Sequence, residues 1–218
     1  MPAATSKGFR AAVFVLLAAA APAAVASAAP AASAPAAASS DPAARQVDAF
    51  HAALLDTMKR AKELGVQGRY NRLQPAVDSA FDFATMTQAI VGPGWASMSA
   101  ADRKSVIDAF RRLTIANYAK NFDGYGGEQF VTSPQVQTRG GDKIVSTQMT
   151  APGKAPIPFI YRLDDSHGGW KIDDIYLNGF VSEVATRRSD FASTLKSGGA
   201  PALVQKLNAL SDTMLKGG

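Results

Sequence analysis

Apolar residues alternate with polar ones in the second half of the chain, and this pattern predicts β-strands. The clearest case is residues 157–164, in which every second side chain points to one face: Ile157, Phe159, Tyr161 and Leu163. Strands are expected at residues 129–138, 143–150, 157–163 and 170–177, with glycine-rich turns at 140–142 and 164–169. Four consecutive strands joined by short connections predict an antiparallel meander.

The last of these strands changes phase at residues 173–174. Trp170 and Ile172 fall on one face. Ile175 and Leu177 fall on the opposite face. One extruded residue, a β-bulge, would produce this change and would also curl the sheet. A curled sheet has a concave face, and a concave apolar face offers a place for a ligand.

Apolar residues at helical spacing predict helices on both sides of the strands. Helices are expected at 42–65, at 69–79 with an interruption near Pro75, between 82 and 92, at 100–121, from 180 to about 196, and from Pro201 onward. Start signals support three of them: Asp41-Pro42, Asp82, and the capping box of Ser99 with Asp102. This order predicts one α+β domain, a four-stranded curled antiparallel sheet covered by several helices around an apolar cavity.

The helix expected after Gly179 carries an arginine on its apolar side. Arg188 falls on one stripe with four apolar residues: Val181, Val184, Phe191 and Leu195. A guanidinium on an apolar face has to be paired or has to reach the rim of that face. Three interpretations follow: an ion pair with Asp173 or Asp174, an aliphatic stem that reaches solvent, or a contact with an anionic ligand group at a pocket mouth.

The amino-terminal residues have the pattern of an export signal. Lys7 and Arg10 precede a short apolar core at residues 11–20, and a small-x-small cleavage site lies at residues 26–28. We therefore expect a signal peptide at 1–28, a disordered Ala/Pro/Ser linker at 29–41, and a single domain at 42–215. Export to the periplasm as a soluble protein is expected.

The amino-acid composition excludes several classes of function. The chain has no cysteine, which excludes disulfides, thiolate chemistry and cysteine-ligated metals. The formal net charge is +5, of which Lys7 and Arg10 belong to the expected signal, so the domain is mildly basic. Such a charge is compatible with transient contact with an anionic membrane surface. Basic residues are not clustered with aromatic ones, so we expect no nucleic-acid binding.

No catalytic or metal-binding constellation is recognisable. The two histidines, His51 and His167, have no metal-ligand spacing, and His51 borders an apolar helical stripe, which favours a packed histidine. Asp173 and Asp174 would point to opposite faces of a strand. Two alternatives remain: an isomerase-like enzyme on an NTF2-like meander, with Asp174 or Tyr161 inside the cone, and a module that binds a partner other than lipid.

Several short motifs together resemble one family. They are Phe81-Asp82-Phe83 followed by Gly92 and Trp95, Ile157-Pro158 with Tyr161, Gly169-Trp170-Lys171-Ile172 with Asp174, and Gly179 followed by Arg188-Ser189-Asp190-Phe191. In order and spacing they resemble the MlaC-like (toluene-tolerance, Ttg2-type) family of periplasmic lipid carriers, from about residue 41 to 210. The residues at 180–184 and Arg187 depart from the usual pattern and are similar to a hopanoid-associated branch.

The resemblance implies a carrier and no enzyme. Members hold phospholipid acyl chains between sheet and helices and serve an inner-membrane ABC transporter complex and an outer-membrane donor or acceptor complex. The expected cargo is a phospholipid or a hopanoid-type lipid, with no other cofactor, and a monomer is expected. We predict that the lipid-binding residues are Phe83, Met86, Tyr118, Phe122, Met149, Phe159, Tyr161, Ile175, Leu177, Val181 and Val184, with Arg188 near the rim.

Overall fold

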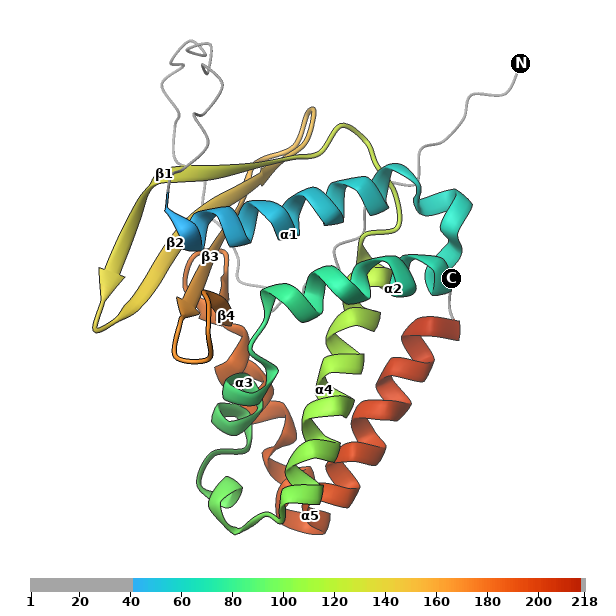
Figure 1. Cartoon of the computed structure of the whole chain (residues 1–218). Helices are drawn as coiled ribbons and strands as arrows, with labels where there is room; N and C mark the ends of the chain where they lie inside the picture. Colours follow the sequence, from blue (N-terminus) through green and yellow to red (C-terminus); the bar gives the residue numbers. More distant parts are fainter. Residues whose placement is uncertain (1–40, 217–218) are drawn as a thin grey trace, which may run out of the picture.

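The computed structural model describes residues 41–216 (Figure 1). The expected signal peptide and all but the last residue of the expected linker lie outside the described residues. The elements follow in the order α1 (Pro42–Lys59), α2 (Ala61–Ala80), α3 (Phe83–Val91), the 3₁₀ helix η1 (Gly92–Ser97), α4 (Ala100–Asn121), five strands and α5 (Glu183–Lys216). Helices thus precede and follow one sheet, and the predicted α+β class is confirmed.

The sheet is an antiparallel meander in chain order. Its strands are β1 (Gln129–Arg139), β2 (Asp142–Thr150), β3 (Ile157–Asp164), β4 (Lys171–Leu177) and β5 (Val181–Ser182). The four predicted strands are confirmed, whereas β5 was missed. Asn178 and Gly179 have positive φ angles of 52° and 82°, and this tight turn returns the chain along β4. Two residues are too few for an alternation to be recognised, so the sequence had placed Val181 in a helix.

The predicted bulge is present in β4. Arg162 of β3 pairs with Asp174, while the next residue, Leu163, pairs with Ile172. Asp173 is therefore the extra residue between the two pairs, and the register shifts there. Because of this shift Ile172 and Ile175 both point to the helix-covered face and are buried.

The two amino-terminal helices differ from the prediction at their junction. α1 ends at Lys59, and Arg60, with φ −107° and ψ 12°, lies between α1 and α2. Gly65, the predicted end of the first helix, interrupts the early part of α2 instead, with a positive φ of 60°. Pro75 lies inside α2. Figure 1 shows α1 lying across the sheet and α2 running back beside α1.

The helix starts predicted at Asp41 and Asp82 are confirmed by their caps, and Ser99 caps α4 by accepting from the Asp102 backbone N–H. The Asp41 carboxylate accepts a hydrogen bond from the Ala43 backbone N–H, and the Asp82 carboxylate accepts one from Thr85. The predicted break near residue 199 is also present, because Gly199 has a φ of 61° inside α5. Figure 1 shows the two halves of α5 running in opposite directions beside α4.

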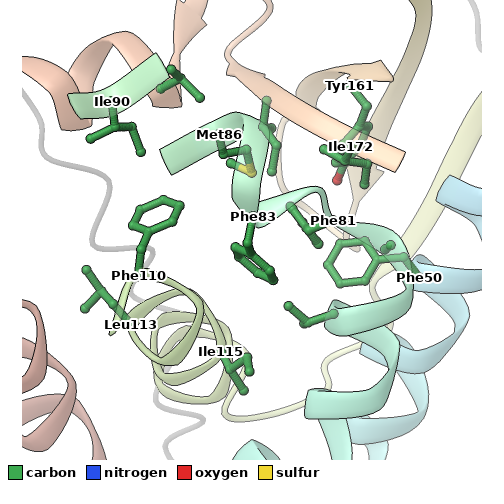
Figure 2. Packing of buried hydrophobic residues seen from close by; sticks show 14 of the residues in the cluster. Phe50, Phe81, Phe83, Met86, Ile90, Phe110, Leu113, Ile115, Tyr161 and Ile172 are labelled. Atoms are coloured by element: carbon green, nitrogen blue, oxygen red, sulfur yellow. The ribbon is translucent and has the colours of Figure 1, made fainter. Parts of the chain in front are cut away.

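An aromatic cluster fills the space between α1, α3 and α4. The ring of Phe50 meets those of Phe81 and Tyr118 edge-on, with both centroids 5.2 Å away. Phe83 stacks on Phe81 at 5.7 Å and meets Phe110 of α4 edge-on at 6.2 Å. Figure 2 shows these phenylalanines with neighbouring aliphatic side chains from α3 and α4. This closed core, which we call the aromatic core, fixes the helices that hold the sheet.

Candidate functional site

The helix-covered face of the sheet is lined by apolar side chains in cross-strand rows. Residues that pair directly in an antiparallel sheet point to the same face. One row joins Phe130, Met149 and Ile157 across β1, β2 and β3. The adjacent row joins Phe159, Leu177 and Val181 across β3, β4 and β5. Both rows lie at the end of the sheet where β1 and β3 begin. We call these two rows the apolar end of the sheet.

The apolar end is incompletely covered by the protein. Met149 is buried, but Phe130, Phe159 and Leu177 are only half-buried although they pack against the core. Val181 is 41% exposed, and the adjoining Phe180 is 77% exposed. Apolar side chains that are left exposed beside a half-buried apolar row are typical of sites that bind apolar partners or ligands.

The predicted lipid-binding residues fall into three groups by burial. Six are buried: Phe83, Met86, Met149, Tyr161, Ile175 and Val184. Four are half-buried, namely Tyr118, Phe122, Phe159 and Leu177, and two are exposed, namely Val181 and Arg188. The sheet residues of this set lie together on one face. Phe83 and Tyr118 instead belong to the aromatic core, where Phe83 meets Phe110 and Tyr118 meets Phe50.

Arg188 does not make either of the two ion pairs considered. Its guanidinium lies against Gly92 at the end of α3, about 3.0 Å from where a Cβ at that position would be. It has no ion pair or hydrogen bond within residues 41–216, so the pairing with Asp173 or Asp174 is wrong. It lines a hollow of about 530 Å³ together with residues of α3 and η1: Thr85, Gln88, Ala89, Gly92 and Pro93. The predicted stripe is also incorrect at Val181, which belongs to β5.

Asp173 and Asp174 are engaged within the fold. Asp173 is buried, which raises the pKa of its carboxyl, and accepts a hydrogen bond of 2.8 Å from Arg162 Nε. The Asp174 carboxylate accepts from three groups: the backbone N–H of Ile175 at 2.8 Å, that of Val184 at 3.1 Å, and the Ser182 hydroxyl at 2.6 Å. Asp174 therefore links β4 to β5 and to the start of α5 by hydrogen bonds, and it caps the first turn of α5.

A buried histidine lies over the apolar face of the sheet. His51 of α1 stacks on Phe130 of β1, with ring centroids 4.1 Å apart, and its Nε2 lies 2.9 Å from the Tyr161 hydroxyl of β3. Burial lowers the pKa of His51 to about 3, so the ring is neutral at neutral pH. The packed histidine is confirmed. Its link to Tyr161 was missed, because the two residues lie 110 positions apart in the sequence.

Two kinds of feature are absent from residues 41–216: a metal-binding cluster and a membrane-spanning helix. Within that range no three His, Cys, Asp or Glu side chains are grouped so that they could hold a metal ion. The same part of the chain contains no helix that combines the length and the hydrophobicity needed to span a bilayer.

The fold and this site define a class: a small α+β protein in which helices cover the apolar face of a curled antiparallel meander. The chain belongs to the MlaC protein family, whose model matches residues 48–209. The structure of a phospholipid-binding protein from Ralstonia solanacearum, solved in complex with a phospholipid, has a similar fold. The two structures superpose with a TM-score of 0.68 and share 23% sequence identity. The comparison covers 78% of this chain and 97% of the Ralstonia solanacearum chain. A comparison with curated protein sequences gives no match.

Proposed function

We propose that this protein is a soluble lipid carrier that holds the acyl chains of a phospholipid, or a hopanoid-type lipid, against the apolar face of the sheet. One observation carries the proposal: the second apolar row of that face continues through Leu177 into an exposed side chain at its end, Val181. Membership of the MlaC family and the likeness in fold to a phospholipid-binding protein support it.

The energetics of such a site need no specific contact with a headgroup. Burial of an acyl chain contributes about 0.8 kcal/mol per methylene, so a lipid with two chains binds firmly through its hydrocarbon alone. Entry of the chains requires the helices and the sheet to separate around the residues that now pack together. Release therefore depends on a partner that stabilises the open state or competes for the lipid.

The proposed setting is the periplasm. A signal peptide at residues 1–28 would direct export, and the domain at 42–215 would carry lipid as a monomer between an outer-membrane complex and an inner-membrane ABC transporter complex. Transient contact with a membrane would occur during transfer. Fractionation of cells that express the full chain, with amino-terminal sequencing of the periplasmic product, tests this: we expect a chain that begins near Ala29, and a product that stays in the cytoplasm would contradict the setting.

The alternative of an isomerase-like enzyme needs a free acid inside the fold. Asp174, one candidate for that acid, already accepts hydrogen bonds from Ile175, Ser182 and Val184. Tyr161, the other candidate, is buried, which raises the pKa of its hydroxyl, and this hydroxyl is already hydrogen-bonded to His51 Nε2. Both groups thus favour a binding role over general acid–base chemistry.

Lipid content of the purified protein is the direct test. Native mass spectrometry and organic extraction should find a phospholipid or a related lipid bound to the chain as isolated from the periplasm. Protein that is free of lipid and that also takes up none from phospholipid vesicles would contradict the proposal and would favour a module for another partner.

A matched pair of variants on β3 locates the site. Phe159 points to the apolar face, whereas its neighbour Ile160 points to the other face and has similar, intermediate burial. Phe159→Ser should lower lipid occupancy several-fold. Ile160→Ser should leave occupancy unchanged, because its side chain lies outside the proposed site. Equal losses in the two variants would show that the lipid does not lie on this face.

A further inference from the structure

A polar atom of His51 is left without a partner in the apolar interior. His51 is 3% exposed, and its Nδ1 is shielded from solvent and has no hydrogen-bond partner in the described part of the chain. Buried nitrogens of this kind are nearly always hydrogen-bonded, because an unpaired one loses its interaction with water and gains nothing. The position of His51 therefore needs an explanation.

The location of this ring ties it to the proposed lipid site. His51 stacks on Phe130 of one cross-strand row and reaches Tyr161, two positions beyond Phe159 on the same face of β3. It therefore lies above the apolar end of the sheet and between two strands that line it. A lipid chain that lay against Phe130 would therefore lie close to the imidazole ring.

We assign the proton of the neutral ring from the hydrogen bond to Tyr161. The Tyr161 hydroxyl has no other hydrogen-bond partner in residues 41–216, so its hydrogen is satisfied only by donation to His51 Nε2. With Nε2 acting as acceptor, the proton of the neutral ring sits on Nδ1. The unpaired atom is thus an N–H donor, and it requires an acceptor.

The chemistry of the surroundings selects the acceptor. A neutral imidazole in an apolar setting offers no charge to balance a phosphate, and burial keeps the His51 ring neutral by lowering its pKa to about 3. A hydroxyl would bring a further hydrogen that needs its own partner. A carbonyl oxygen accepts a hydrogen bond and brings no donor, so it completes the site without a new unpaired group.

We propose that His51 Nδ1 donates a hydrogen bond to an ester carbonyl oxygen of the bound lipid and thereby makes the protein selective for ester-linked lipids. The proposal rests on the proposed lipid-carrier function and adds a specificity determinant to it. The apolar rows then hold the hydrocarbon, and His51 fixes how far the chains enter.

Competition between two lipids with the same headgroup tests the inference. The probes are a phosphatidylglycerol with two hexadecanoyl ester chains and its analogue with two hexadecyl ether chains, which lacks both carbonyl groups. The wild-type protein should prefer the ester lipid by about three- to tenfold, the factor expected for one net hydrogen bond. Displacement of a fluorescent lipid and native mass spectrometry both report this ratio.

Three variants separate recognition from packing. His51→Phe keeps a flat ring against Phe130 but removes the donor, so the ester preference should disappear. His51→Asn places an amide N–H near the position of Nδ1 and should restore part of it. Thr87→Val is the matched control, because Thr87 Oγ1 is the other buried side-chain atom without a partner in the described residues, and it should keep the full preference.

Each outcome decides between the two proposals. Equal binding of ester and ether lipids by the wild-type protein overturns the role of His51 and leaves the carrier function standing. A preference that survives in His51→Phe, or that is lost in Thr87→Val, overturns it as well. Failure of the wild-type protein to bind either lipid overturns the carrier function and, with it, the role of His51.

Discussion

The aromatic core and the apolar end of the sheet are built from the same kinds of side chain, but within residues 41–216 the protein covers only the first more or less completely. Phe50 is 1% exposed and meets aromatic rings from other elements. Phe180, beside the apolar end, is 77% exposed. Apolar groups that the chain itself covers stabilise the fold, whereas those it leaves open are available to a ligand. We therefore expect the aromatic core between the helices to supply stability, and the apolar end of the sheet to supply binding.

The largest contrast between the two regions is expected from alanine substitutions. Phe50→Ala should lower the free energy of unfolding by about 3–5 kcal/mol, because it leaves a cavity in a closed aromatic cluster. Phe180→Ala should change it by less than about 0.5 kcal/mol, because the side chain is mostly in solvent. Urea denaturation of both variants measures the difference. Similar losses in the two would break the distinction drawn here.

An intermediate effect is expected at the junction between β4, β5 and α5. Asp174→Ala leaves the backbone N–H groups of Ile175 and Val184 without an acceptor inside the protein, and should cost about 2–3 kcal/mol. It should also lower lipid affinity, because it loosens the turn that carries Phe180. Denaturation and lipid uptake are the measurements.

Asp164 supplies the control for that variant. Its carboxylate accepts from Ser166 in an exposed turn, so Asp164→Ala should be nearly neutral in both assays. An Asp174→Ala protein with full stability and weakened lipid uptake would instead assign Asp174 a direct role in binding.

The smallest effect is expected at the cap of α3, and it depends on pH. Burial opposes ionisation of Asp82, but hydrogen bonds from Thr85 and His167 outweigh it and lower the pKa of the carboxyl below its ordinary 3.8. A depressed pKa in the folded state adds stability above that ordinary value, and this stability is lost as the pH falls through the folded-state pKa. Asp82→Ala should therefore cost about 1 kcal/mol at pH 7, and the cost should shrink below about pH 4.

Asp108→Ala is the matched control for this titration. Asp108 pairs with Lys104 on the exposed side of α4, with both side chains more than half exposed. Removal of such a pair changes the free energy of unfolding by less than about 0.5 kcal/mol. A cost at Asp82 that is the same at pH 3 and pH 7 would show that the charge of its carboxylate does not stabilise the cap.

The local pattern of the sequence was sufficient for most of the fold. Strict alternation marked β3, and the change of phase at Asp173 marked the bulge, because both are properties of neighbouring residues. Asp41 and Asp82 marked helix starts for the same reason. β5 escaped detection, because a strand of two residues has no period.

The candidate site could be predicted only in part. The sequence indicated which sheet residues share a face, so Phe159, Leu177 and Tyr161 were correctly grouped. The sequence also placed Phe83 among the lipid-binding residues, because a hydrophobic pattern does not distinguish a closed core from an open apolar surface. The position of Arg188 beside Gly92 depends on how α5 packs on α3, which no local pattern encodes.

The sequence by itself determined most of the elements, their order and the apolar face of the sheet, because these follow from the spacing of side chains along a regular backbone. Tertiary structure alone decided which apolar residues are covered and which are left open. It also brought His51 to Tyr161 across 110 residues and left one nitrogen of the ring without a partner among residues 41–216. Such contacts depend on the packing of distant segments, where the covering of each side chain is set by its neighbours in space and not by its neighbours in the chain.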